Sequence, residues 1–210
     1  MSGNLKRFGI VLGLLLGLGL PPLTTQAQLP DPTSERVTNR AMLLRMGNDA
    51  YQSGQFTQAE AVFRKILEEY PNDAVIYYKL GNTLYRQKRL EAAIVEYQKA
   101  IALNPNYAVA HNALGTTYAI QNRMTEAIAS FRQAVQINNT YSEALANLGQ
   151  ALWLDGKPEE AVSFLKKARD LYKEQGKLNE LDRVEKLLRE IGSKEPTVSR
   201  GPAPAGVTQG

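Results

Sequence analysis

The sequence repeats itself every 34 residues, and this period constrains the fold more than any other feature. A shift of 34 residues superposes small residues on small residues, and apolar residues on apolar residues, through four consecutive copies. Chance does not produce five such columns over four copies. The columns are Gly47, Gly81, Gly115 and Gly149; Ala59, Ala93, Ala127 and Ala161; Met46, Leu80, Leu114 and Leu148; Phe63, Tyr97, Phe131 and Leu165; and Ile66, Ala100, Ala134 and Ala168.

Each copy has the spacing of two helices. Leu80 and Leu84 are separated by one helical turn, and Ala93, Tyr97 and Ala100 follow at intervals of four and three. Glycine, asparagine, proline and charged pairs interrupt this pattern, so they are expected to end one helix and begin the next. The expected turns within copies are Gly54-Gln55, Lys88-Arg89, Asn122-Arg123 and Gly156-Lys157, and those between copies are residues 70–72, 104–106 and 138–140.

The columns of small residues predict how the helices pack. Gly81 and Ala93 are expected where the two helices of a copy cross, because a larger side chain would push the axes beyond the usual separation of about 8–10 Å. The aromatic column fills the space beside them. One helix pair cannot bury its own apolar face, so the copies have to stack and share stability with their neighbours.

The segment Ala74–Tyr107 carries the whole pattern, AVIYYKLGNTLYRQKRLEAAIVEYQKAIALNPNY. It resembles the motif of the tetratricopeptide repeat family, and the resemblance extends over four copies. It implies an all-α fold, a right-handed α-solenoid of four helix-turn-helix repeats. The fourth copy lacks the closing proline, so its second helix is expected to continue to Gly176. The expected repeats are residues 40–73, 74–107, 108–141 and 142–175.

An amphipathic segment at residues 176–191 follows the repeats. A helix there is expected to cover the apolar end of the stack, and this capping role is favoured over that of a partner-binding helix. Residues 192–210 contain almost no large apolar side chain and are predicted to be disordered. The apolar face of the capping helix is Leu178, Leu181, Val184, Leu187, Leu188 and Ile191.

Residues 1–27 have the pattern of a secretory signal peptide. Lys6 and Arg7 precede the apolar run Phe8–Leu20, which is shorter than the roughly twenty residues of a membrane-spanning helix. Small residues precede a cleavage site after Ala27, and an uncleaved N-terminal anchor is the alternative. The signal predicts export to the periplasm or another extracytoplasmic space, which in a photosynthetic source includes the thylakoid lumen.

Residues 28–39 are predicted to form a linker and the start of the first helix. Cleavage would remove two of the 25 basic residues and none of the 21 acidic ones, which leaves 23 against 21. Nucleic-acid-binding surfaces need clustered positive charge, so this balance excludes a nucleic acid as the expected partner.

The resemblance also implies a binding surface. In this family the first helices of the repeats line a concave groove, and the 34-residue register carries the groove-facing positions onto this sequence. Amide side chains there would suit the backbone of an extended peptide, because they both donate and accept hydrogen bonds. Aromatic residues would add contact area, unless they pack against neighbouring helices instead. The candidate groove residues are Asn48, Tyr51, Tyr78, Asn82, Tyr85, Arg86, Asn112, Thr116, Gln150 and Trp153.

One binding mode of the family is not expected here. The branch that binds chaperone tails clamps a terminal carboxylate with lysine, asparagine and arginine side chains drawn from three copies. The matching positions lack the cationic pair in either register, so acidic C-terminal tails are poor candidates as ligands. These positions are Leu44, Asn48, Lys79, Val109 and Ala113, or Tyr78, Asn82, Ala113, Glu143 and Asn147.

Few residues could support catalysis. The chain has no cysteine, and its only histidine, His111, falls in a column of apolar residues that indicates helix packing. No glycine-rich phosphate loop occurs in the repeats, and Glu68-Glu69 and Glu159-Glu160 are adjacent residues whose side chains diverge around a helix. We therefore expect no enzyme activity, no cofactor and no metal site.

These patterns predict a scaffold or adaptor that binds a protein or an extended peptide through its concave groove. The export signal suggests a role in the assembly of an envelope or membrane complex. The convex face is a second surface that a partner could use. The alternative function is a structural self-association module with no groove ligand, and an RNA-binding helical repeat is disfavoured by period, charge and export signal.

Overall fold

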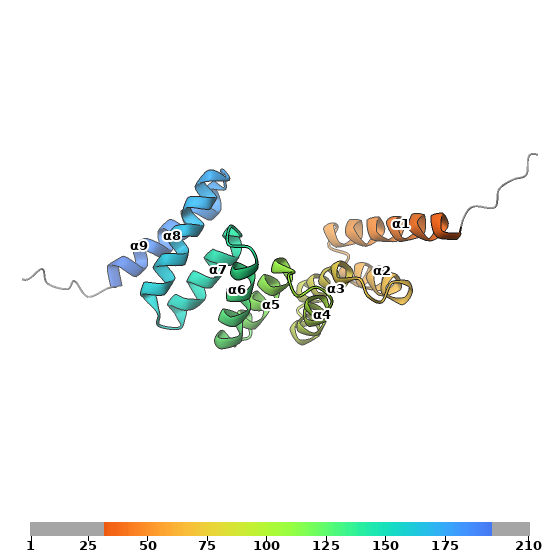
Figure 1. The fold of residues 1–210 in the computed structure, drawn as a ribbon, viewed down its shortest axis with the longest axis horizontal. Coiled ribbons are helices and arrows are strands. Elements are labelled where there is room, and N and C mark those ends of the chain that lie inside the picture. Colours follow the sequence, from red (N-terminus) through yellow and green to blue (C-terminus); the bar gives the residue numbers. More distant parts are fainter. Residues whose placement is uncertain (1–31, 195–210) are drawn as a thin grey trace, which may run out of the picture.

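The computed structural model describes residues 32–194, and these residues form nine α-helices and no strand. The predicted signal peptide and residues 28–31 lie outside the described residues, as do residues 195–210. The helices succeed one another along the long axis of the molecule, from α1 to α9 (Figure 1). They are α1 (Pro32–Gln52), α2 (Phe56–Glu69), α3 (Ala74–Arg86), α4 (Leu90–Leu103), α5 (Ala108–Ile120), α6 (Met124–Ile137), α7 (Ser142–Leu154), α8 (Pro158–Glu174) and α9 (Leu178–Lys194).

The turn inside each repeat contains one residue with left-handed backbone geometry. The φ angles are 74° at Gly54 and 76° at Gly156, and they are 64° at Lys88 and 60° at Asn122. The four residues occupy one position of the 34-residue register, and they confirm the predicted breaks within the copies. Glycine adopts this geometry without steric cost, so Lys88 and Asn122 are the two positions that carry strain.

The two helices of each repeat cross at the predicted glycine column. A Cβ atom added to Gly81 would lie 2.6 Å from Cε1 of Tyr97, and one added to Gly115 would lie 2.7 Å from Cδ1 of Phe131. Non-bonded carbon atoms stay about 3.5–4.0 Å apart, so only glycine lets the ring lie against the first helix. Tyr97 is 1% exposed, and its hydroxyl donates a hydrogen bond to Oδ1 of Asn82 at 2.8 Å.

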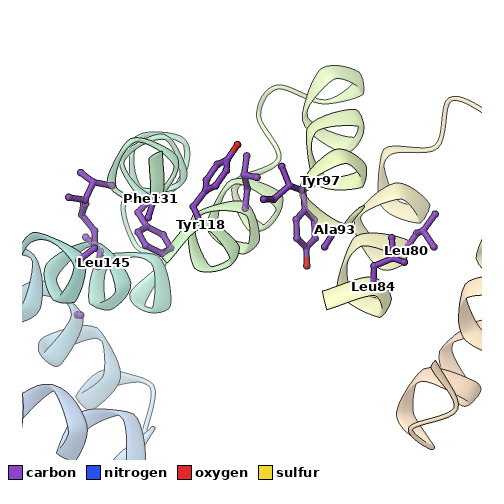
Figure 2. Packing of buried hydrophobic residues seen from close by; sticks show 14 of the residues in the cluster. Leu80, Leu84, Ala93, Tyr97, Tyr118, Phe131 and Leu145 are labelled. Carbon is purple, nitrogen blue, oxygen red and sulfur yellow. The ribbon is translucent and has the colours of Figure 1, made fainter. Parts of the chain in front are cut away.

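Helices that are adjacent in the sequence are also adjacent in space. Each helix packs against the next, and α3 also contacts α5, α5 contacts α7, and α7 contacts α9. The buried side chains form one core that continues from repeat to repeat, and Figure 2 shows part of it from Leu80 in α3 to Leu145 in α7. The fold is therefore an α-solenoid of four helix pairs and a capping helix, as the repeat predicts.

The first helix leaves one apolar face open. Ile76 and Leu80 of α3 are 0% and 1% exposed, because they pack against the preceding repeat. The equivalent residues of α1, Met42 and Met46, are 55% and 44% exposed, because no described helix precedes α1. The register placed Met46 in a column of core residues, and its exposure corrects that expectation.

The last helix covers the opposite end of the stack. α9 packs against α8 and contacts α7, and it buries Val184 and Ile191. Leu178 was expected on the same apolar face, but it is 71% exposed because it is the first residue of α9, directly after the turn at Gly176. α8 has 17 residues where α6 has 14, in line with the extension predicted from the missing proline.

The end of α9 corrects the predicted start of the disordered tail. The helix continues to Lys194, so residues 192–194 are helical and the capping helix does not end at Ile191. Neither Gly192 nor Ser193 turns the backbone out of the helix, and the Ser193 hydroxyl donates to the carbonyl oxygen of Glu190 at 2.9 Å. Within residues 32–194, no helix combines the length and hydrophobicity that crossing a bilayer requires.

Candidate functional site

The inner side of the solenoid is formed by the first helices of the repeats. α3, α5 and α7 contact one another in succession, whereas α4, α6 and α8 make no comparable contacts with each other in the described part of the chain. Helices on the concave side of a curved array lie closer together than those on the convex side. These contacts place α3, α5 and α7 on the side where the sequence predicts the groove.

Four polar residues occupy one register position of the groove, Asn48, Asn82, Thr116 and Gln150, and two of them are engaged within the chain. Oδ1 of Asn82 accepts the hydrogen bond from Tyr97, and the Thr116 hydroxyl donates to the carbonyl oxygen of Asn112 at 3.0 Å. Asn48 is half-buried, whereas Gln150 is exposed. Gln150 is thus the member of the row that is best placed to meet a ligand.

The predicted aromatic residues pack against their own neighbours. Tyr51 meets Phe56 edge to face with ring centroids 5.6 Å apart, and the Arg86 guanidinium lies 5.7 Å and 4.8 Å from these two ring centroids. Tyr78 lies 6.0 Å from the ring of Tyr97 and 5.3 Å from that of Tyr107. The structure therefore brings Tyr51 and Arg86 together, but in a contact that the chain itself completes.

Tyr85 and Trp153 are half-buried and pack against the core, so they offer a ligand only part of their surface. This is the packing alternative that the sequence left open for the aromatic residues. Burial raises the pKa of the Tyr97 hydroxyl far above its ordinary value, and the neighbouring Tyr78 adds to this shift. The hydroxyl of Tyr97 therefore acts as a neutral hydrogen-bond donor to Asn82.

Asn112 belongs to a buried polar network. It is 4% exposed, and its Oδ1 accepts a hydrogen bond from Nδ2 of Asn147 at 3.0 Å. Its own Nδ2 donates to the Tyr141 hydroxyl at 3.3 Å and to Oε1 of Glu143 at 3.4 Å. Burial, and then the charge of Glu143, raise the pKa of Tyr141. The network joins the third repeat to the fourth, and it leaves Asn112, a predicted groove residue, buried between them.

A cavity of about 650 Å³ opens between α7, α8 and α9. Its walls combine apolar side chains with charged residues of α9, and Arg183 lies 3.8 Å from Glu180. Burial, and then the charges of Glu143 and Glu180, raise the pKa of Tyr172. The lining residues are Glu143, Ala146, Asn147, Gln150, Leu165, Tyr172, Lys177, Glu180, Arg183, Val184, Lys186, Leu187 and Glu190.

A second cavity of about 270 Å³ lies next to the first, between α5, α6 and α7. Asn147 and Gln150 line both cavities, so the two form one continuous surface on the inner side of the third and fourth repeats. Ile120 and Leu154 at its edge are 55% and 61% exposed. The lining residues are Thr116, Ala119, Ile120, Met124, Phe131, Asn147, Gln150, Ala151 and Leu154.

The candidate residues from the sequence account for only part of this surface. Thr116 and Gln150 line a cavity, whereas Ala119, Asn147 and the charged side chains of α9 were missed. The sequence alone could have indicated Ala119, because this residue is an alanine at a register position that is aromatic in the other copies, Tyr51, Tyr85 and Trp153.

His111, the histidine that the sequence assigned to helix packing, makes a contact within the chain. Nε2 of His111 lies 3.0 Å from the carbonyl oxygen of Pro105, so the ring ties α5 to the turn before it. No group of three or more histidine, aspartate or glutamate residues in the described range could hold a metal ion. The site offers amide groups, apolar walls and paired charges, which are the components of a protein-binding surface.

Comparison with known proteins identifies the repeat. Two models described as tetratricopeptide repeat match the chain, one over residues 44–108 and the other over residues 108–174. No curated protein matches the sequence. A crystal structure of MamA is 29% identical with a TM-score of 0.61, and the alignment covers 66% of this chain and 81% of that one.

Two further solved structures share the fold and are named for peptide binding. YrrB, described as having an unusual peptide-binding site, is 23% identical with a TM-score of 0.55 over 63% of this chain and 68% of its own. The first tetratricopeptide repeat domain of Spaghetti, bound to an HSP90 peptide, is 20% identical with a TM-score of 0.54. The alignment covers 56% of this chain and 93% of that one. The two family models together span residues 44–174. The chain belongs to the tetratricopeptide repeat family, whose fold generally serves as a non-enzymatic protein-interaction scaffold.

Proposed function

We propose that this protein is an exported adaptor that binds an extended segment of a partner protein in the inner groove of its third and fourth repeats. The observation that carries the proposal is the pair of adjoining cavities that share Asn147 and Gln150. Side chains of α5, α7 and α9 line these cavities and supply apolar, amide and charged groups. An extended segment could contact all three kinds of group at once.

The N-terminal half of the groove supports this assignment by contrast. Arg86 stacks on Tyr51, and Asn82 accepts a hydrogen bond from Tyr97, so these groups are already paired. In the C-terminal half, Ile120, Gln150 and Leu154 are exposed on the inner side. A partner that covers exposed apolar side chains of this kind removes their surface from water, which stabilises a complex.

The class of partner agrees with the names of similar structures. YrrB is described as having a peptide-binding site, and the Spaghetti domain is bound to a peptide. We therefore assign a protein or an extended peptide as partner to this chain, with no nucleic acid. The proposed role is binding, without catalysis and without a cofactor.

The proposed location rests on the pattern of residues 1–27. Export to the periplasm or another extracytoplasmic space is supported by three features of this segment: a basic start, an apolar run that is too short to span a bilayer, and the small residues Thr25 and Ala27 before the cleavage site. Contact with the membrane would then be transient, or lasting if the segment stays attached as an anchor. An exported adaptor would serve the assembly of an envelope or membrane complex.

Affinity capture with matched variants tests the groove. The tagged protein is used to recover partners from its own envelope fraction, in parallel with a variant that carries Ile120→Asp and Leu154→Asp. The control variant carries Val95→Asp and Leu103→Asp, at residues that are 47% and 41% exposed on α4. We expect the groove variant to lose the partners that the control variant retains, as read by mass spectrometry.

Two results would contradict the proposal. Partners lost only in the α4 variant would move the binding surface to the outer side. Recovery of the chain alone, with a sedimentation coefficient that rises with protein concentration, would favour self-association instead.

A further inference from the structure

The 34-residue register relates two sites in the groove. The site in the first half is closed, because side chains of the chain itself fill it, whereas the equivalent site in the second half is open. In the closed site, Tyr51 at the end of α1 and Phe56 at the start of α2 form an edge-to-face pair, with ring centroids 5.6 Å apart. Arg86 at the end of α3 extends over both rings, at 5.7 Å and 4.8 Å from their centroids. The space between consecutive first helices is thus filled by the chain itself.

A shift of 68 residues, two repeats, moves this site onto Ala119, Met124 and Leu154. All three residues line the cavity of about 270 Å³. Alanine stands where the closed site has a tyrosine ring, and leucine stands where it has a guanidinium group. The cavity therefore lies where the first half of the groove holds its own side chains.

The chemistry of the cavity is apolar with one free amide at its edge. Met124 and Ala151 form part of the wall, and Ile120 and Leu154 expose their side chains at the rim. Among the polar residues, Thr116 donates to a backbone carbonyl and Asn147 donates to Asn112. Gln150 is exposed and lines both cavities, so a ligand in the groove can reach its side chain.

We propose that this cavity receives one leucine or phenylalanine side chain from the extended partner segment, and that Gln150 binds the segment's backbone beside it. The size agrees, because an apolar cavity of about 150 Å³ already holds a benzene molecule. An apolar occupant also covers the exposed side chains of Ile120 and Leu154, and burial of such surface from water stabilises a complex. This inference rests on the proposed groove function and adds the register and chemistry of the ligand.

Peptide selection against the purified protein tests this assignment. A displayed library of random peptides is selected on the protein, and an enriched peptide is synthesised with a fluorescent label. We expect one leucine or phenylalanine to recur at a fixed position of the enriched peptides. Replacement of that residue by alanine should weaken binding by about tenfold or more, because the buried side chain supplies much of the affinity.

Ala119→Tyr places a ring in the cavity, at the register position that Tyr51 occupies in the closed site. We expect this variant to bind the peptide at least about tenfold more weakly in fluorescence polarisation. The matched control is Ala129→Tyr, which makes the same change at an exposed residue of α6 and should bind normally. Circular dichroism and thermal unfolding verify that both variants are folded. Leu154→Ser is a second variant that removes the rim without filling the cavity, and it should also weaken binding.

These experiments distinguish failure of the cavity assignment from failure of the proposed groove function. Equal affinity of the original protein and the Ala119→Tyr and Leu154→Ser variants would overturn the cavity assignment, and so would enriched peptides without a recurring apolar residue. The groove function would stand in both cases if Ile120→Asp with Leu154→Asp still abolished binding. Failure to enrich any peptide would contradict both proposals.

Discussion

At the scale of single residues, the contact between Gly81 and Tyr97 carries several tasks at once. The glycine lets the ring reach the first helix, the ring fills the core, and the hydroxyl fixes Asn82 on the groove side. A change at Gly81 therefore acts on packing and on the groove together. Core positions of this kind tolerate added volume poorly, because the surrounding side chains are already closely packed.

Gly81→Ala should lower the free energy of unfolding by about 1–3 kcal/mol, because the new methyl group would overlap the Tyr97 ring. Chemical denaturation followed by circular dichroism measures this change. The control is Gly192→Ala in α9, where an added Cβ atom meets nothing within 4 Å and stability should be unchanged or slightly higher. Equal effects of the two substitutions would show that the crossing is not tightly packed.

At the scale of elements, one carboxylate ties the first repeat to the second. Oε1 of Glu60 in α2 accepts hydrogen bonds from Arg64, and Oε2 accepts from Gln87 at 3.1 Å and from Arg89 at 2.7 Å. Burial alone would raise the pKa of Glu60, but the hydrogen bonds and the charges of Arg89 and Arg64 hold it below the ordinary value of 4.5. The turn between α3 and α4 is thereby fastened to α2.

Glu60→Gln should destabilise the protein by about 1 kcal/mol at neutral pH, because charge-assisted hydrogen bonds are lost. A lowered pKa means that the folded state favours the ionised form, so this stabilisation is complete above pH 4.5 and disappears as the pH falls through the lower folded-state value. The difference between the two proteins should therefore shrink below pH 4.5 in denaturation series. Glu68→Gln, at an exposed residue of the same helix, is the control and should leave the free energy of unfolding at neutral pH unchanged.

The elements also show what the sequence could and could not predict. The repeat columns located the helix pairs and their crossings, because those contacts recur in every copy. The exposure of Met46, and the burial of Asn112 against Asn147, depend on which helix lies next to them, so an alignment of copies alone does not reveal them. The cavity at Ala119 requires three residues from three helices to be considered together.

At the scale of the whole molecule, stability is transmitted between neighbours. In the described range, each helix contacts the next one. The main contacts beyond that join α3 to α5, α5 to α7 and α7 to α9. A solenoid of this kind behaves as a chain of coupled units, so a local loss should weaken nearby repeats more than distant ones. The two ends of the stack are therefore the places where the coupling can be measured.

Ile191→Ala should remove about 2–5 kcal/mol of stability from the cap, because this side chain is 1% exposed. Hydrogen exchange should show faster exchange of amides in α8 and α9, with little change in α2 and α3. Leu178→Ala, at a residue that is 71% exposed in the same helix, should leave the exchange pattern unchanged. A uniform loss of protection across all repeats would instead show that the solenoid unfolds as a single unit.

The uncovered face of α1 has a consequence in redox terms. The chain has no cysteine, so its methionines carry its only sulfur atoms. Met42 and Met46 are 55% and 44% exposed on one face of α1, so an oxidant reaches both thioethers directly. Oxidation to the sulfoxide turns an apolar side chain into a polar one. The end of the stack that is open to solvent is thus also the end whose surface chemistry an oxidising environment changes first.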